Sequence, residues 1–295
     1  MKTNRLWISI MVVVVSFLSC KKKSVRTAGL KGEQMIPASV KFMSEIKNEL
    51  GFLPEAIYSI NIKSIINSPF MKILQNQFTK LSTNSKCLMS VLEKTQYLHI
   101  FSRNQEFIRT NEDPKKMALN EILVFYGVDS IAAQKCFANH FPDMLLAKSG
   151  DKLKTLPGTG YMWSPSRDIL VTAPMSLIGK LIPGKGKLGS GKLDFLKQKP
   201  SVVFYFNQGK SFEKGAGFID FSKGLDTDVF LIYKRELLAR VAQNQYKNMK
   251  RFFGANKKYS KLLDNLDFYK NEKTVAFSFT QTRFQLRQLM GIFGL

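Results

Sequence analysis

The sequence predicts an α+β protein in which antiparallel or mixed sheets carry helices packed on one face. Of the 295 residues, 44% are hydrophobic and 12% aromatic, which is enough to build a sizeable core. Short runs of β-branched and aromatic residues are followed repeatedly by a turn or cap and then by an apolar stripe with helical spacing. Between residues 201 and 233, three such runs are separated only by turn residues, a pattern typical of an antiparallel meander.

The first half of the chain alternates strands with helices. Strands are expected at residues 56–62, 97–101, 121–126 and 169–172. Ser68 and Pro69 are typical of a helix start, and the apolar stripe after them reaches Phe78. A second helix, capped by Asp129 or Ser130, should pass through Cys136, and a third should follow Pro174 as far as Ile182.

The second half contains the predicted meander, with strands at 201–206, 217–221 and 229–233. A helix over 235–253, a strand over 274–279 and a closing helix over 284–293 follow. The recurring strand–helix order, at uneven spacing, predicts two similar α/β sandwiches rather than a solenoid. We place the first domain at 46–190 and the second at 191–295, although one continuous sheet would produce the same pattern.

The first nineteen residues have the features of an export signal. Lys2 and Arg5 precede an apolar run from Leu6 to Leu18. This run suits the hydrophobic region of a signal peptide and is shorter than the roughly 20 residues that span a bilayer as a helix.

The end of this run, Phe17-Leu18-Ser19-Cys20, resembles the lipobox of bacterial lipoproteins. The resemblance implies that cleavage leaves Cys20 as the acylated first residue of a protein anchored in the cell envelope and facing the periplasm. Phe17 and Leu18 depart from the usual pattern and are similar to the looser lipoboxes of spirochaetes and some other groups. Lys21 is not the Asp that retains some lipoproteins at the inner membrane, so the resemblance favours the outer membrane. The alternative is an uncleaved N-terminal anchor, because positive charge just after an apolar segment tends to stay in the cytoplasm.

Residues 20–45 are expected to form a Lys-rich tether. The segment begins with three lysines, lacks clear periodicity and contains Gly29, Gly32 and Pro37, which interrupt regular structure. A flexible tether would hold the folded body clear of the lipid headgroups.

Two cysteines remain after lipidation of Cys20. An exported chain favours a structural disulfide between Cys87 and Cys136, with two buried thiols as the alternative. His140 lies one helical turn after Cys136, a spacing that would allow a thiolate–imidazole pair. Because Pro142 ends the helix soon afterwards, a capping role for His140 is preferred.

The chain carries an unusual positive charge. It has 45 Lys and Arg against 22 Asp and Glu, a formal net charge of +23, and most of its cations are Lys. Lys is a hydrated point charge, so the excess suggests a general field rather than a specific reader of bases, and export excludes nucleic acid as a natural partner. The predicted contacts with membrane or other anions are Lys21, Lys22, Lys23, Lys185, Lys187, Lys192, Lys247, Lys250 and Arg251.

No catalytic residue, metal site or cofactor is predicted. Two His and three Cys leave few ways to build zinc, haem or iron–sulfur sites. The Gly184–Gly189 segment matches a dinucleotide fingerprint, but it follows a predicted helix and Pro183 instead of a strand. The overlapping P-loop match, from Gly186 to Lys192, has Leu193 where Ser or Thr is needed, so both matches indicate a cationic loop.

These observations favour a lipid-anchored envelope protein without enzymatic activity, whose basic surface faces an anionic membrane, lipopolysaccharide or another envelope partner. The alternative is a carrier or chaperone that holds an apolar or lipid ligand between its sheet and helices. A hydrolase is disfavoured because no nucleophile–base pair is evident in the sequence.

Overall fold

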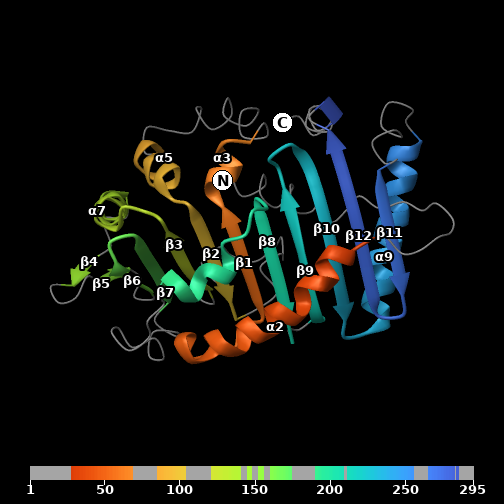
Figure 1. Cartoon of the computed structure of the whole chain (residues 1–295), viewed down its shortest axis with the longest axis horizontal. Coiled ribbons are helices and arrows are strands. Elements are labelled where there is room, and N and C mark those ends of the chain that lie inside the picture. Colours follow the sequence, from red (N-terminus) through yellow and green to blue (C-terminus); the bar gives the residue numbers. More distant parts are fainter. Residues whose placement is uncertain are drawn as a thin grey trace.

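A computed structural model describes residues 28–68, 85–103, 121–140, 145–147, 152–155, 160–174, 190–208, 211–255, 265–282 and 284–285. Figure 1 shows a broad sheet with helices packed on it. The predicted helices over 70–78 and 177–182, and most of that over 284–293, lie outside these residues.

The described strands form one antiparallel sheet of twelve strands, in the order β11-β12-β10-β9-β8-β1-β2-β3-β7-β6-β5-β4. Their bounds are β1 Ala56–Asn61, β2 Tyr97–Ser102, β3 Glu121–Tyr126, β4 Leu145–Ala147, β5 Lys152–Thr155, β6 Gly160–Ser166, β7 Ile169–Pro174, β8 Val202–Asn207, β9 Phe212–Asp220, β10 Gly224–Tyr233, β11 Leu266–Asn271 and β12 Thr274–Thr282.

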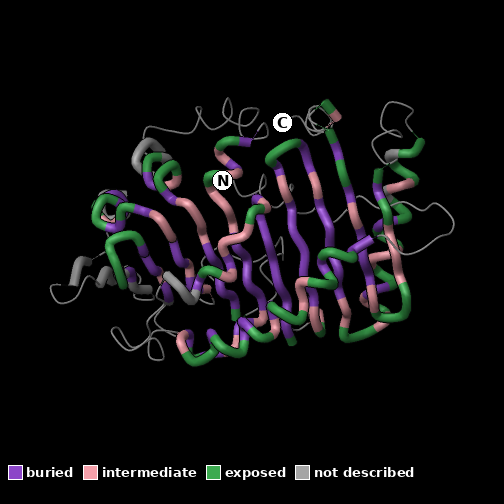
Figure 2. The backbone as a smooth tube through the Cα atoms, viewed as in Figure 1, coloured by how far each residue is buried: buried purple, intermediate pink, exposed green. Residues whose placement is uncertain are grey.

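The α+β class with an antiparallel sheet is confirmed, and the described strands belong to one continuous sheet rather than to two. β8 pairs along its length with β1, so the predicted domain boundary at 190/191 falls within a single sheet. The strands at this junction are buried on both faces, and every residue of β8 is buried. Figure 2 shows buried residues continuing across the middle of the sheet.

The two halves of the sheet repeat one order of elements. In the first, the strands β1, β2 and β3 are followed by helix α7 (Ser130–His140), by the extra strands β4 and β5, and by the hairpin β6–β7, whose last strand pairs with β3. In the second, the meander β8–β9–β10 is followed by helix α9 (Glu236–Gly254) and by a hairpin whose last strand, β12, pairs with β10. The antiparallel β1–β8 pair joins the halves.

Helices cover both faces of the sheet, which corrects the prediction of one covered face. Helix α2 (Leu30–Leu50) and the 3₁₀ helix η3 (Ser190–Leu196) share a core cluster with inward residues of β1, β8 and β9, such as Ile57 and Tyr205. Strand alternation places the cluster of α5 (Ser85–Lys94) and α7 on the opposite face, around Phe125 and Leu170. The short helix α3 (Ile62–Ile66) packs near α5. Strands that are apolar on both sides need cover on both sides.

The predicted tether is wrong over most of its length, because α2 begins at Leu30. The glycines that interrupt the sequence pattern are contact points with the sheet. Gly29 has a φ of 73°, and a Cβ there would lie 2.6 Å from the Cβ of Ala276. A Cβ on Gly32 would lie 2.7 Å from the carbonyl oxygen of Ala216. Glycine therefore lets the start of α2 approach the strands directly.

Helix α7 begins as predicted. The Asp129 carboxylate accepts a hydrogen bond from the Ala132 backbone N–H at 3.1 Å, which is the N-cap contact. The helix ends at His140. Cys136, on its buried side, is disulfide-bonded. Helix α5, which carries Cys87, packs against α7, but the Cys87 side chain lies outside the described part, so the Cys87–Cys136 pairing stays a prediction.

Candidate functional site

Helix α9 lies at one edge of the sheet, over the face opposite α2 (Figure 1). Ala239 and Tyr246 on its inner side are buried, and the Tyr246 ring stacks on Phe268 of β11 with 4.3 Å between ring centroids. The Glu236 carboxylate accepts a hydrogen bond from Lys270 of β11 at 3.3 Å. These contacts fix which side of α9 faces outward.

The outward side of α9 carries an apolar ridge, which we define as Leu237, Val241 and Phe252. Their exposed fractions are 67%, 45% and 76%, respectively. Spacings of four and eleven residues place the three side chains on one face of the helix. Large apolar side chains aligned on an exposed face are typical of an interaction surface, whereas single exposed ones are ordinary.

A cationic row runs beside this ridge. Arg240, Lys247 and Arg251 are exposed and lie seven and four residues apart, so they share a second line along the helix. Of these three side chains, only Arg240 forms an ion pair with another described residue, Glu236, at 3.0 Å. The hydrogen bond from Arg240, together with that from Lys270, lowers the pKa of Glu236. The exposed side chains of the row point into solvent.

The predicted anion contacts divide into three groups. Lys247 and Arg251 lie in the cationic row, whereas Lys250 is half-buried and belongs to the side of α9 nearer the sheet. The η3 helix contains Lys192, whose side chain is outside the described part. The others, together with the lipidation site Cys20, lie outside the described residues; they are Lys21, Lys22, Lys23, Lys185 and Lys187.

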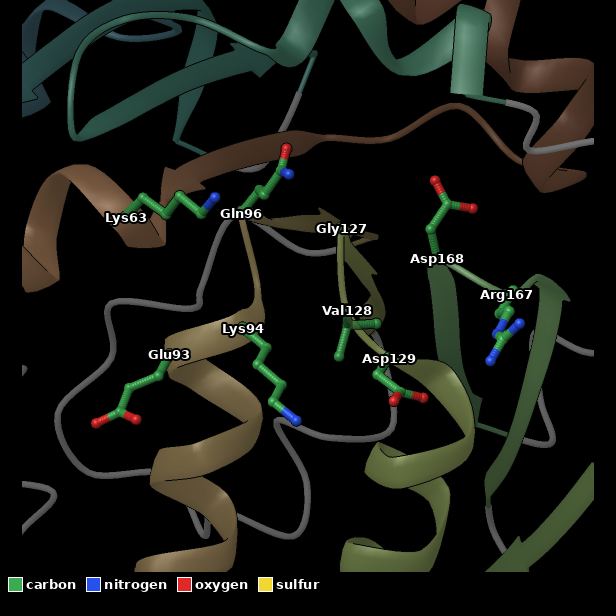
Figure 3. Close-up of a pocket in the computed structure, with 9 residues that line it drawn as sticks. All are labelled: Lys63, Glu93, Lys94, Gln96, Gly127, Val128, Asp129, Arg167 and Asp168. Atoms are coloured by element: carbon green, nitrogen blue, oxygen red, sulfur yellow. The ribbon is translucent and has the colours of Figure 1, made fainter.

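A second feature is an open hollow of about 670 Å³ at the ends of β2, β3 and β7. Figure 3 shows its wall: Lys94 extends from α5 toward the gap before α7, and Arg167 and Asp168 come from the turn before β7. Its full lining is Lys63, Glu93, Lys94, Gln96, Gly127, Val128, Asp129, Arg167 and Asp168. Val128 is the one hydrophobic side chain in this set, so the hollow does not suit the apolar ligand of the carrier hypothesis.

Two of the acidic groups of the hollow, Asp129 and Asp168, have structural partners. Asp129 caps α7, and Asp168 accepts a hydrogen bond from the Ser166 hydroxyl at 2.5 Å. The backbone N–H of Gly127 donates to the Asp168 carbonyl at 2.8 Å. These contacts show that part of the wall of the hollow stabilises the turns that meet there.

A buried Ser–His pair is a feature that sequence reasoning missed. Ser59 on β1 and His99 on β2 are opposite one another, with 3.0 Å between Ser59 Oγ and His99 Nδ1. The Ser59 hydroxyl donates its hydrogen to the Leu196 carbonyl at 2.6 Å, so His99 Nδ1 must be the donor to Ser59. This polarity is the reverse of a nucleophile–base pair, and both side chains are buried.

The environment of His99 keeps its ring neutral. Burial, followed by the nearby charge of Lys197, lowers the pKa of His99 to about 3. Among the described residues, its Nε2 atom has no hydrogen-bond partner. Lys197 itself pairs with Asp194 at 2.6 Å and lies 3.9 Å from the Tyr126 ring centroid. The Ser59–His99 pair holds η3 against the sheet, because the Ser59 hydroxyl binds the carbonyl of Leu196, the last η3 residue.

Within the described residues, no helix is both long and apolar enough to cross a bilayer. The same residues contain no group of three His, Cys, Asp or Glu side chains arranged to bind a metal ion.

No protein-family model matches the chain, and no curated protein matches it. The solved structures similar to it include three crystal forms of TP0453. Form I is 7% identical, with 83% of this chain and 96% of that chain covered and a TM-score of 0.44. Form III is 8% identical, with 83% and 97% covered and a TM-score of 0.43. Form IV is 8% identical, with 82% and 95% covered and a TM-score of 0.42.

Proposed function

We propose that the chain is a non-enzymatic, lipid-anchored envelope protein that makes a second contact with an anionic phospholipid bilayer through the outward side of α9. The observation that supports this proposal is the apolar ridge of Leu237, Val241 and Phe252 beside the cationic row of Arg240, Lys247 and Arg251. Helices that lie on membranes combine apolar side chains, which enter the headgroup region, with cations that meet anionic lipid.

The expected affinity of α9 alone is modest. Each cation near an anionic surface contributes about 1 kcal/mol, so the row contributes about 3 kcal/mol. The ridge adds a further small term, because only three separated side chains can enter the headgroups. A contact of this strength is transient by itself, but a lipid anchor raises the local concentration of α9 at the membrane and makes the contact persistent.

The proposal is tested with the unlipidated chain from residue 21 onward, mixed with phosphatidylglycerol-containing or neutral vesicles at low and high salt. We expect co-sedimentation with the anionic vesicles only, and its loss at high salt as charges are screened. The triple variant Arg240→Gln, Lys247→Gln and Arg251→Gln should bind about 100-fold more weakly, which follows from about 1 kcal/mol per cation.

A matched triple variant controls for net charge. Lys41, Lys47 and Lys135 are exposed and lie on α2 and α7, away from α9. Their replacement by Gln removes the same charge and should weaken binding less than tenfold. Equal losses in the two triple variants, equal binding to neutral vesicles, or binding to lipopolysaccharide but not to phospholipid would overturn the proposal.

A further inference from the structure

We infer that the end of the molecule formed by β10, β12, β11 and α9 faces the membrane, with the hollow between α5 and α7 held away from it. The inference rests on the proposed function and adds an orientation to it. It follows from two attachments, the lipid on Cys20 and the outward side of α9, that converge on this end of the sheet.

The first attachment is short because α2 starts early and is fastened to the sheet. The Gly29 backbone N–H donates to the Ser278 hydroxyl of β12 at 3.1 Å, and the Gly32 N–H donates to the Asp228 carboxylate of β10 at 2.7 Å. The Ser278 hydroxyl in turn donates to Asp228 at 2.5 Å. The chain is therefore tied to β10 and β12 where α2 begins.

The length of chain between the lipid and this fastening limits where the membrane can be. Ala28, the first described residue, lies eight positions after Cys20. Fully extended, this segment spans at most about 29 Å, at about 3.6 Å per residue. A tether that ran to residue 45 would reach far beyond this and would leave the orientation of the body unrestricted.

The strand order shows which end of the sheet this short tether can bring close to the membrane. β12 lies next to the β11 edge, whereas β4, at the other edge, is ten strands away from β12. At about 4.8 Å per strand, that distance is roughly 48 Å, which the tether cannot cover. Helix α9 contacts β12 and β10, the same two strands that hold the start of α2. Because α2 and α9 cover opposite faces of the sheet at the same end, the lipid and the cationic row meet one membrane when this end, rather than either face, is turned toward it.

Figure 1 shows the arrangement that this inference uses. The start of α2 lies at β12 and α9 lies beside β11, whereas α5 and α7 lie toward the β4 edge. With the β11 end toward the bilayer, the hollow near α7 opens into the aqueous space, where it is accessible to soluble molecules.

The test uses the full lipidated chain in vesicles whose headgroups carry a fluorescence quencher. One fluorophore is placed on Lys273→Cys, in the exposed turn between β11 and β12, and another, in a separate sample, on Lys135→Cys of α7. Labelling under non-reducing conditions leaves the disulfide of Cys136 intact. We expect at least threefold stronger quenching at Lys273 than at Lys135. Equal quenching overturns the inference, and so does a chain that mass spectrometry shows is not acylated at Cys20.

Neutral vesicles separate this inference from the proposed function. On neutral lipid only the anchor acts, so stronger quenching at Lys273 supports the short-tether argument even where the unlipidated chain fails to bind anionic vesicles. Insertion of a twenty-residue Gly/Ser segment between Thr27 and Ala28 should abolish the difference on neutral vesicles. The same segment added after Leu295 is the control and should leave it unchanged. A difference that survives the first insertion overturns the role of the tether.

Discussion

Replacement of Asp228 by Ala tests how the start of α2 is held. Asp228 is buried in the middle of β10, and its carboxylate accepts hydrogen bonds from the Gly32 N–H and the Ser278 hydroxyl. The N–H groups of the first helical turn have no partner within the helix, and the helix dipole favours a negative charge beside them. Asp228 therefore caps α2 from a strand that lies almost two hundred positions later in the sequence.

The expected cost follows from these contacts. Hydrogen bonds to a charged group contribute about 1.5–3 kcal/mol each, and the Ala variant leaves the buried Gly32 N–H and the half-buried Ser278 hydroxyl without their acceptor. Removal of the carboxylate also ends the cost of burying its charge, which offsets part of this loss. We expect unfolding to become easier by about 3 kcal/mol, which corresponds to a fall of about 5 °C in Tm for a chain of this length.

Asp226→Ala is the matched control on the same strand. Asp226 is two residues earlier, on the same face of β10, but it is only half-buried and contacts Lys31 at 3.7 Å and Thr280 at 3.2 Å, both on the surface. Surface pairs of this kind contribute about 0–1 kcal/mol, so Tm should fall by less than about 2 °C. Thermal unfolding followed by circular dichroism measures both variants. Equal effects of the two substitutions would refute the capping role of Asp228.

Three further predictions concern pH and redox state. The pKa of His99 is lowered to about 3 in the folded state, so the free energy of unfolding should fall as the pH drops from about 6.5 toward 3. Urea unfolding at several pH values should show a shallower fall for the His99→Asn variant. An unchanged dependence on pH in that variant would contradict this account. Burial raises the pKa of Glu121 to about 8, so the folded state holds a proton that the unfolded state loses, and stability should decline between about pH 4.5 and 8. Glu121→Gln should remove that part of the decline, and a variant with the wild-type pH profile would show that Glu121 is ionised in the fold. Peptide mass mapping without reductant should show a link between Cys87 and Cys136. Reduction of this disulfide should lower the free energy of unfolding by about 4 kcal/mol, because it opens a loop of about 50 residues. A link from Cys136 to Cys20 would overturn both the pairing and the lipidation of Cys20.

The strands were predictable because local pattern and final environment agree. At β1, β2, β3 and β8 the runs of β-branched and aromatic residues begin within one residue of the observed strands. β11 and the hairpins before β7 were not predicted. β11 has the sequence LDFYKN, in which buried Leu266 and stacked Phe268 alternate with polar residues at a sheet edge. A short strand with one polar side differs little from a loop in sequence.

Helix α2 was missed because the features that place it act over long range. Glycines at its start and Pro37 within it argue against a helix when only local preference is considered. The glycines fit because Ala216 and Ala276 leave room for close approach, and the cap comes from Asp228. The buried side of α2, which includes Phe42, Met43 and Ile46, adds the tertiary packing that outweighs weak propensity.

The candidate site was predictable in part. The amphipathic pattern of residues 235–253 correctly indicates α9 and places Tyr246 toward the sheet. The prediction covered the helix over 235–253 but not which of its apolar residues stay exposed, so the outward ridge was not anticipated. Lys250 was grouped with its neighbours for the same reason, since position along a helix does not show which flank the sheet occupies. The Ser59–His99 pair depends on the register of β1 against β2, which no local pattern specifies.

The repeated order of elements helps to decide whether the positive charge forms a functional surface or only reflects the overall amino-acid composition. Helices α7 and α9 occupy equivalent places in the two halves, each after three antiparallel strands. A general preference for Lys and Arg would load both helices alike. Instead, α7 has the sequence SIAAQKCFANH, with Lys135 as its one Lys or Arg, whereas α9 carries four, among them the row of Arg240, Lys247 and Arg251. The helix nearer the start of α2, and hence nearer the proposed lipid, is the one that carries the cations. This asymmetry between equivalent helices favours a functional surface on α9, because composition alone gives no reason for it.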